Sequence, residues 1–343
     1  MDRSVSNILK ALNQAESRTI TVFGDYCLDK YLYIDPTRNE DSVETGLQAY
    51  QVYKKALFPG VGGTIASNLC ALGVRVHCVG LVGDDGEGYD LIKGLDLIGA
   101  ETDLMVRAES IMTGTYIKPM LANANDTYTE MNRLDIRNFM AIPSELGEQL
   151  LENLEKALEV SQGVVVSDQF LENDGSAVTS WVRCEIAKIA KRYPEKYFVV
   201  DSRGFADRYH DVIVKCNQFE LPGIIDDGDR MNKGAILSGG KELLSSVGRA
   251  VVVTVGSEGA YVFEGDSTVH IPPFSVDGPL DIVGAGDATN AGMILGLTLG
   301  LSLSEAVLLG GCISSITIQQ LGVTGSATIE QIRERLQNFT ARK

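Results

Sequence analysis

The feature that most restricts the fold of this chain is an alternation of short apolar runs with longer segments of helical periodicity. The apolar runs predict strands at 18–23, 74–82, 163–167, 197–201, 212–216 and 250–255. The segments between them predict helices at 64–72, 89–98, 144–159, 175–193 and 232–247. Continuous apolar strands separated by helices are typical of a parallel sheet covered on both faces. We therefore expect an α/β fold of three layers, with helices on both sides of a mainly parallel central sheet.

Both ends of the chain are predicted to be helical. Residues 5–15 have an amphipathic pattern, and the last part predicts helices at 287–300, 302–320 and 328–339. Ser302 with Glu305, and Thr328 with Gln331, have the spacing of capping boxes at the starts of the last two helices.

Two segments, 31–58 and 111–134, interrupt the α/β pattern. They are rich in tyrosine, polar and charged residues and have little helical periodicity, so they predict short strands. We expect 1–343 to form a single domain in which these two segments pair as a small β lobe over the carboxyl edge of the main sheet. Ligands of open α/β sheets bind at that edge, so the lobe is predicted to close over the site as a lid. Its unpaired strand edges further predict a homodimer through the lid.

The charge balance excludes some classes of partner. The net charge is −16 and no cluster rich in Lys or Arg occurs, so a nucleic-acid or anionic-membrane surface is not expected. No apolar run is long enough to span a bilayer, and the start of the chain has no signal-peptide pattern. Six scattered cysteines without a CxxC pair are typical of reduced, buried thiols. These features predict a cytoplasmic protein.

The run Asp281–Ala288 contains the strongest candidate for chemistry. Its small residues allow a sharp turn into a helix, whose first N–H groups have no intrahelical acceptor and form an anion site. A carboxylate at Asp287 would repel a phosphate bound at this site, so its presence needs an explanation. The best explanation is that it accepts a proton from a hydroxyl that attacks phosphorus. From this run alone, a tight turn with Asp287 as the helix N-cap explains the residues equally well.

Two further polar groups follow predicted strands. Asn217 and Glu220 follow one strand, and Glu220 could hold Mg²⁺ through water. Thr254–Gly259 follows another, and its glycines would let the backbone approach a nucleotide. The simpler alternatives are a loop that caps the next element for the first group, and a hairpin into 260–263 for the second.

Two groups near the start of the chain could contact a polyol. The segment Gly60–Thr64 precedes a helix, where N–H groups could bind hydroxyls or phosphate; the alternative is a hinge into the lobe. Asp25 and Asp29 flank a strand end and could accept hydrogen bonds from sugar hydroxyls, the alternative being solvated loop charges. Together, these groups supply what a phosphotransferase needs: a base, an anion hole, a metal anchor, a nucleotide loop and polyol acceptors.

In these motifs and in their order, the chain resembles the PfkB-type sugar kinases of the ribokinase superfamily. Asp281–Asp287 resembles the family signature D-T-x-G-A-G-D, Asn217–Glu220 its N-x-x-E motif, and Thr254–Gly259 its T-x-G-x-x-G motif. Gly60–Leu72 resembles its N-terminal glycine-rich signature. The resemblance implies a ribokinase-like three-layer αβα sandwich with a small β-sheet lid.

Within this family, the chain is most similar to the kinase half of bacterial heptose-phosphate kinase/ADP-heptose synthases. That similarity lies in Gly24–Tyr31, Arg133–Asp135, Ser167-Asp168 and Leu321-Gly322. We expect the nucleotidyltransferase half to be absent, since the chain ends shortly after the kinase pattern.

The resemblance implies roles for individual residues. Asp287 would be the catalytic base, and the backbone of Gly284, Ala285, Gly286 and Asp287 the anion hole. Asn217 and Glu220 would organise Mg²⁺ and phosphate oxygens, with ATP lined by Thr254, Gly256 and Gly259. The substrate would be held by Asp29, Gly60, Gly62, Gly63, Thr64 and Arg133. Asp281 and Val283 fall where some relatives bind a monovalent cation, so K⁺ is a third expected cofactor beside ATP and Mg²⁺.

The departures from the family pattern concentrate on the substrate side. Ile282 stands where the signature has Thr, Val61 follows Gly60 where a second Gly is usual, and Thr64 stands where Asn is frequent. The Ser-Asp-Tyr-x-Lys-Gly of heptose kinases becomes 167–172, Ser-Asp-Gln-Phe-Leu-Glu. The prediction is therefore an ATP-dependent carbohydrate kinase, with a heptose phosphate as the nearest analogy and fructose- or ribose-like acceptors open.

Two other functions stay open. One is a catalytically inactive sugar- or nucleotide-binding regulatory protein on the same fold, suggested by the substrate-side departures. The other is a dinucleotide-dependent oxidoreductase, suggested by Gly80–Gly86, although the glycine spacing there is G-x-x-G-x-x-G rather than G-x-G-x-x-G.

Overall fold

A computed structural model describes residues 2–125, 127–172, 174–221 and 232–341. Its main sheet has nine strands in the order β16-β15-β14-β13-β12-β11-β1-β6-β7. The neighbours from β7 to β14 pair in parallel, while β15 and β16 add an antiparallel hairpin at one edge. The strands are β1 (Thr19–Gly24), β6 (Arg75–Gly83), β7 (Val106–Ala108), β11 (Gly163–Asp168), β12 (Tyr197–Ser202), β13 (Ile213–Asn217), β14 (Ala250–Thr254), β15 (Ala260–Glu264) and β16 (Ser267–Ile271).

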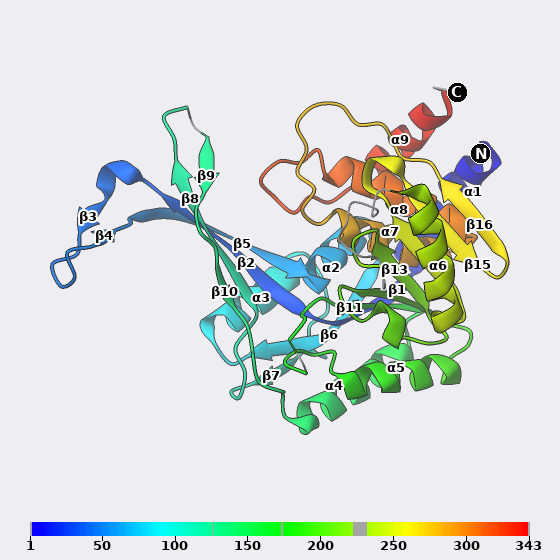
Figure 1. Cartoon of the computed structure of the whole chain (residues 1–343), viewed down its shortest axis with the longest axis horizontal. Coiled ribbons are helices and arrows are strands. Elements are labelled where there is room, and N and C mark those ends of the chain that lie inside the picture. Colours follow the sequence, from blue (N-terminus) through cyan, green and yellow to red (C-terminus); the bar gives the residue numbers. More distant parts are fainter. Residues whose placement is uncertain (1, 126, 173, 222–231, 342–343) are drawn as a thin grey trace.

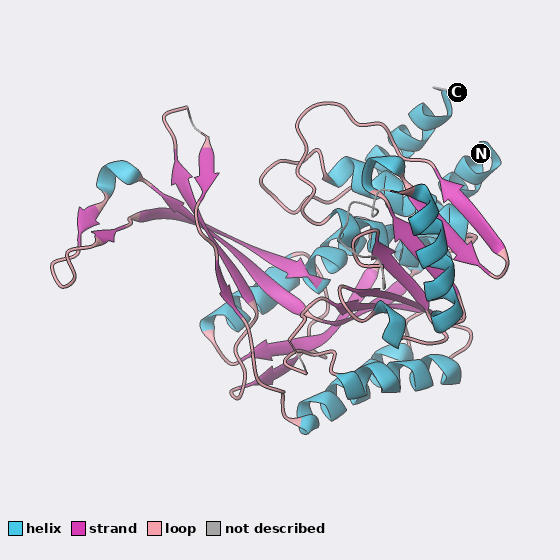
Figure 2. Cartoon of the chain, viewed as in Figure 1, coloured by secondary structure: helices cyan, strands magenta, loops and turns pink. Residues whose placement is uncertain are grey.

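Helices cover both faces of this sheet (Figures 1 and 2). Because side chains of a strand alternate between faces, neighbours such as Val22 and Phe23 lie in two separate apolar cores. One core contains residues of α1 (Asp2–Ala11), α2 (Gly62–Ala71), α3 (Gly86–Leu97), α7 (Ala285–Thr298), α8 (Leu303–Thr317) and α9 (Ile329–Ala341). The other contains residues of α4 (Ser144–Leu158), α5 (Ser180–Arg192) and α6 (Lys233–Val247). The expected three-layer α/β architecture is confirmed.

A second, smaller sheet projects from the main body (Figure 1). Its order is β10-β8-β2-β5, with β9 paired to β8. Strand β2 pairs in parallel with β8 and antiparallel with β5. The strands are β2 (Tyr26–Ile34), β5 (Val52–Val61), β8 (Thr115–Ala122), β9 (Tyr128–Glu130) and β10 (Leu134–Ile136), and a hairpin of β3 (Glu40–Asp41) and β4 (Gln48–Ala49) lies between β2 and β5. The sheet takes strands from both of the non-helical segments, but β2 begins five residues before position 31.

Several element boundaries differ from the sequence-based expectation. The helix expected at 175–193 begins only at Ser180, because Thr179 caps it by accepting a hydrogen bond from the Val182 N–H. Residues 5–15 are split between α1 and a 3₁₀ helix, Leu12–Ser17. Strand β16 was not expected, since four of its five residues are exposed and lack an apolar pattern.

The capping boxes are confirmed at both of the last helices. Ser302 and Glu305 exchange side-chain and backbone hydrogen bonds at the start of α8. At the start of α9, Thr328 N donates to Gln331 at 2.8 Å and Gln331 N donates to the Thr328 hydroxyl at 3.3 Å. Of the cysteines, Cys184 is exposed, and none of the six is in a disulfide. Within the described part of the chain, no helix is long and apolar enough to cross a membrane.

Candidate active site

The turn into α7 forms one wall of the site. Gly284 is the N-cap in a left-handed conformation (φ 79°), and a Cβ there would lie 2.8 Å from the Thr324 methyl and 3.2 Å from that of Thr64. Glycine is therefore required by both backbone and packing. The same contact places Thr64, in the first turn of α2, beside the start of α7, so two segments more than 200 residues apart meet at this point.

Two N–H groups at the start of α7 are open. Ala285 N donates to the Ile282 carbonyl at 3.2 Å, which closes the turn. The N–H groups of Gly286 and Asp287 have no acceptor among the described residues, as expected at a helix N-terminus. The anion hole expected from the sequence therefore has fewer N–H donors than predicted, because the Ala285 N–H already donates to the Ile282 carbonyl.

Asp287 is the third residue of α7 and not its N-cap. Its side chain is partly buried, and its pKa is raised to about 8 by burial first and by the Asp201 carboxylate second, against the opposing charge of Lys215. The charge of Asp29 in the second sheet also raises it, so the two carboxyl groups are close enough to interact electrostatically. The alternative interpretation of Asp287 as the helix N-cap is therefore wrong, and its carboxyl group, with a pKa of about 8, stands in the first turn of α7.

A buried ion pair lies beneath Asp287. The ammonium group of Lys215, in the middle of β13, is 2.8 Å from a carboxylate oxygen of Asp201 near the end of β12, and Asn290 of α7 donates to the same oxygen. A Cβ at Gly286 would lie 2.9 Å from the Lys215 nitrogen, so this glycine lets the helix approach the pair. Burial lowers the pKa of Lys215, but Asp201 and Glu220 outweigh it and the pKa is raised. Lys215 is therefore charged, and its ammonium group lies beside the first turn of α7.

Glu220 joins this cluster from the loop after β13. It accepts a hydrogen bond from Asn217 N at 2.9 Å, and its pKa is raised by burial and by Asp201. Asp201 thus repels the carboxylates of both Glu220 and Asp287, while the charges of Lys215 and Arg203 oppose this effect. The oxygens of the three carboxylates do not all lie within 4.8 Å of one another. A hard cation such as Mg²⁺, which prefers carboxylate oxygens and keeps much of its hydration shell, would therefore be held here through water.

The predicted nucleotide segment lies next to this loop. Asn217 and Thr254 are register partners on β13 and β14. Gly256 and Gly259 have positive φ angles of 56° and 91°, and Val255 N bonds to the Gly259 carbonyl. A Cβ at Gly259 would lie 2.1 Å from the Ile271 carbonyl oxygen. The hairpin interpretation is therefore correct for the local structure, and the same hairpin turn stands beside the carboxylate cluster.

The second sheet supplies Asp29. Its carboxylate is 2.8 Å from the Lys118 ammonium, which also donates to the Tyr31 hydroxyl at 3.0 Å. Asp25 and Asp29 are 1% and 6% exposed, so the interpretation as solvated loop charges is wrong. Arg133 is exposed and forms a bidentate pair with Asp135, at 2.6 and 2.8 Å, while its guanidinium lies over the Tyr116 ring.

The glycines between β5 and α2 are packed rather than open. A Cβ at Gly60 would lie 2.6 Å from an Asp29 carboxylate oxygen, and one at Gly63 would lie 2.4 Å from Pro59. Gly62 N donates to the Asp25 carbonyl at 3.1 Å. The Gly62 N–H is therefore unavailable to a ligand, contrary to the expectation of an open N–H group. The segment connects the second sheet tightly to α2, as the hinge alternative implies.

The turn before α7 holds the expected monovalent-cation residues. The two carboxylate oxygens of Asp281 accept from Val283 N and Gly322 N, each at 3.1 Å. The carboxylate therefore fixes the turn and joins it to the loop after α8.

Comparison with known proteins matches residues 22–330 to the model of the pfkB family of carbohydrate kinases. The chain belongs to this family. It is 27% identical to the bifunctional protein HldE of Trichlorobacter lovleyi over 331 residues and 26% identical to HldE of Magnetococcus marinus over 325 residues. These alignments cover 94% and 92% of the chain but 64% and 63% of the relatives, so the chain spans less than two thirds of their length.

Solved structures with this fold include other sugar kinases. Arabidopsis thaliana ribokinase complexed with ribose and ATP has a TM-score of 0.67 at 16% identity, covering 93% of this chain and 98% of that one. Escherichia coli phosphofructokinase-2 in complex with potassium has a TM-score of 0.71 at 19% identity, covering 94% and 99%. These likenesses establish the ribokinase-like fold.

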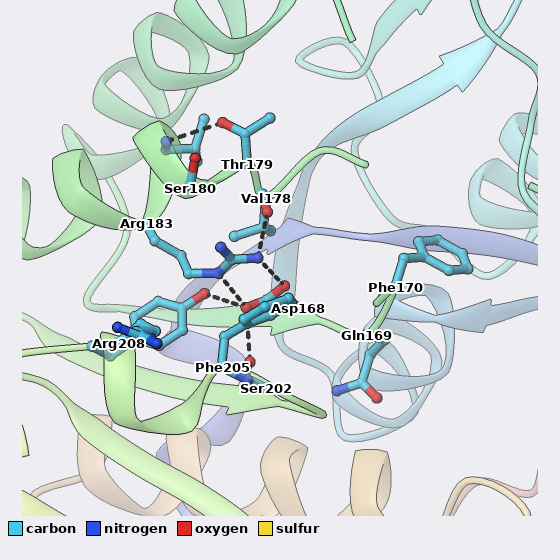
Figure 3. A network of polar contacts seen from close by, with 12 residues as sticks. Asp168, Gln169, Phe170, Val178, Thr179, Ser180, Arg183, Ser202, Phe205 and Arg208 are labelled. Carbon is cyan, nitrogen blue, oxygen red and sulfur yellow. Dashed lines mark hydrogen bonds and ion pairs between the residues drawn. The ribbon is translucent and has the colours of Figure 1, made fainter. Parts of the chain in front are cut away.

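A buried polar network surrounds Asp168, the last residue of β11 (Figure 3). Asp168 accepts from Arg183 Nε and the Ser202 hydroxyl at 2.8 Å each, and from the Tyr209 hydroxyl at 2.9 Å. Asp25 accepts hydrogen bonds from the N–H groups of Gln169 and Phe170, the two residues that follow Asp168. Burial and the Asp168 charge raise the pKa of Asp25 to about 7. The network fixes the loop after β11, where the family pattern has changed.

Asp201, Lys215 and Asn290 were missed by the sequence analysis. The available signal was a lysine within the apolar run 212–216, because a buried charge needs a partner. The identity of that partner could not be predicted, since it depends on which strands lie side by side.

Proposed function

We propose that this pfkB-family chain is an ATP-dependent kinase that phosphorylates a hydroxyl of a sugar or sugar derivative, with Asp287 as the general base. The observation that carries the proposal is Asp287 itself. A carboxyl group with a raised pKa stands in the first turn of α7, beside the Gly286 and Asp287 N–H groups, and the charges of Lys215 and Asp29 both act on it. This geometry suits proton removal from a hydroxyl held between the two aspartates.

The chain's own residues supply the steps of the reaction. Asp29 accepts a hydrogen bond from a neighbouring sugar hydroxyl and orients the acceptor. Asp287 takes the proton of the attacking hydroxyl as the oxygen bonds to phosphorus. The N–H groups of Gly286 and Asp287 donate to the transferring phosphoryl oxygens, and the Lys215 charge stabilises the developing negative charge.

The nucleotide and metal would lie over the carboxyl ends of β13 and β14. The loop Thr254–Gly259 would line the nucleotide, while Glu220 and Asp201 would hold Mg²⁺ directly or through water. Bound there, the metal neutralises phosphate charge. Asp281 and the Val283 carbonyl are the candidates for K⁺, which a comparison of activity in potassium and choline chloride would test.

The second sheet is proposed to act as a lid and as a dimer interface. A lid would exclude water from the phosphoryl group and so limit ATP hydrolysis. Its outer parts expose large apolar side chains that a second copy could cover: Val43, Leu47, Tyr50, Tyr53, Tyr128 and Leu134. We expect a dimer in light scattering at micromolar concentration, and a monomer under those conditions would contradict the interface.

The proposed function is tested by ADP release from Mg²⁺-ATP across a panel of sugars and sugar phosphates. Release that depends on an acceptor supports a kinase. ATP binding in calorimetry, without release for any acceptor, would instead favour a non-catalytic binding protein.

A further inference from the structure

The imidazole of His77, on strand β6, is a buried polar group that makes no hydrogen bond with a described residue. The residue is 7% exposed, and both of its ring nitrogens are buried without a hydrogen-bond partner. Nδ1 lies 3.1 Å from Glu101 Oε2, but the two groups are not aligned as a hydrogen bond. Unpartnered buried polar atoms are costly, so a group that binds this imidazole is expected.

Two carboxylates converge on the His77 imidazole. Glu101 is fixed beside it by the backbone, because Cys78 N donates to the Glu101 carbonyl at 2.9 Å and Glu101 N donates to the Val76 carbonyl at 2.8 Å. Asp103 follows two residues later. One ligand atom from each of His77, Glu101 and Asp103 lies within 4.8 Å of the other two. The three donors are therefore close enough to share one small cation.

The donor set indicates which kind of cation would fit. An imidazole nitrogen with two carboxylate oxygens is typical of zinc and similar first-row transition metals, whereas Mg²⁺ and Ca²⁺ prefer oxygen donors throughout. The two carboxylates would neutralise the charge of a divalent ion. Asp103 is exposed, so the cluster is open to solvent on that side. The opening gives the ion an entry path and leaves a coordination position for water.

The Glu101 carboxylate is oriented from its other side by Arg75. Arg75 Nε donates to Glu101 Oε1, which leaves Oε2 toward His77. The Asp103 charge also acts on the pKa of Arg75, so this guanidinium lies near both carboxylates. Partners of this kind hold metal ligands in place. The Arg75 side chain is 61% exposed, so it can also turn to water when a cation takes over the carboxylate charge.

The cluster lies on the opposite face of the main sheet from Asp287. Side chains of a strand alternate between the two faces. Val76 and Cys78 belong to the apolar core that contains α7, whereas Val79 belongs to the other core. His77 therefore points to the face covered by α4, α5 and α6. A metal ion bound there would be distinct from the Mg²⁺ proposed at the carboxyl ends of β12 and β13.

We propose that His77, Glu101 and Asp103 form a binding site for one transition-metal dication of the zinc class. The ion would tie the connection between α3 and β7, which contains Glu101 and Asp103, to strand β6. Its role is to stabilise the fold, because it lies away from the site proposed for phosphoryl transfer. This inference does not depend on the kinase function.

The test is calorimetric titration of ZnCl₂ into the full chain after treatment with EDTA and dialysis, with excess Mg²⁺ present throughout. We expect one Zn²⁺ per chain with a Kd of about 10 µM or lower. The melting temperature should rise by about 4 °C when free Zn²⁺ reaches about 100 times the Kd. No Zn²⁺ binding up to about 100 µM would overturn the proposal.

Substitutions decide whether these three residues are the ligands. Asp103→Asn keeps the size of an exposed side chain, so it should fold normally and weaken Zn²⁺ binding by at least about tenfold. His77→Gln should weaken it at least as much. Asp266→Asn and His270→Gln are the matched controls, since both replace an exposed residue of the β15–β16 hairpin, and they should leave the Kd unchanged. A Kd unaffected by Asp103→Asn would mean that His77 is merely paired with Glu101 and would contradict the site.

Cobalt distinguishes this site from zinc captured by a cysteine. Co²⁺ bound to one imidazole and two carboxylates should show d–d absorption without a sulfur-to-metal charge-transfer band. The absorption should be lost in Asp103→Asn and disappear when Zn²⁺ is added in excess. A charge-transfer band would place the metal on a thiol, such as that of the exposed Cys184, and would overturn the assignment.

Discussion

At the scale of single residues, the account depends on a carboxyl group that the protein holds in an unfavourable environment. Burial and the neighbouring Asp201 charge raise the pKa of Asp287 to about 8, although Lys215 opposes this. Such a group accepts a proton readily once ionised, which is what a general base near neutral pH requires.

The pH dependence of the reaction follows from this value. A base acts only when deprotonated, so log kcat/KM for the acceptor should rise with a slope near 1 below about pH 8 and level off above it. The apparent pKa of kcat should be lower, since a Mg²⁺ ion bound with the nucleotide would favour the carboxylate. Initial rates between pH 5.5 and 9.5 test this, and a profile that is flat from pH 6 to 9 would contradict it.

At the scale of elements, close helix packing positions the site. Helix α7, which carries Asp287, crosses α8 where a Cβ at Gly310 would lie 2.5 Å from the Thr289 carbonyl oxygen. At the next residue, Gly311, a Cβ would have its nearest neighbour, the Phe274 ring, at 3.9 Å. One glycine is therefore required for the crossing and the other is not.

These two neighbouring glycines make a matched pair for mutation. Gly310→Ala should destabilise the protein by about 2 kcal/mol through overpacking against α7. Gly311→Ala should be neutral or stabilising by about 0.5–1 kcal/mol, because alanine is the better helix former. Urea unfolding of both variants measures the difference, and equal effects would show that the crossing is not tight.

The elements also show what the sequence can predict. The central strands were predicted because both of their faces are buried, which makes them continuous apolar runs. The start of α5 was misplaced because the cap at Thr179 follows a loop of buried residues that resembles a helical pattern. The Asp201–Lys215–Asn290 cluster and the closure of the Gly62 N–H were not predictable, since each joins segments distant in the chain.

At the scale of the whole molecule, the site reduces stability. The pKa of Asp287 in the folded protein, about 8, exceeds its ordinary value of 3.8, so the folded protein holds more protons than the unfolded chain between these pH values. The contribution of Asp287 to the free energy of unfolding therefore falls as the pH rises from about 4 to about 8. Asp25, with a pKa of about 7, acts in the same direction.

This sign gives a prediction for an inactive variant. Asp287→Asn cannot ionise, so it should unfold about 2 °C or more above the unmodified protein at pH 9, with a smaller difference at pH 5. Asp266→Asn, at the exposed β15–β16 turn, is the control and should show no such trend. A lower melting temperature for Asp287→Asn at pH 9 would mean that the carboxylate stabilises the fold.

The most direct test of the central claim is acceptor-dependent ADP release by Asp287→Ala beside the unmodified protein. The account predicts that kcat falls by at least about 10³-fold, since the base is lost. ATP affinity in calorimetry should stay within about threefold, because the nucleotide segments are untouched. Asp287→Ala with a kcat within about tenfold of the unmodified protein would contradict the assignment of Asp287 as the base.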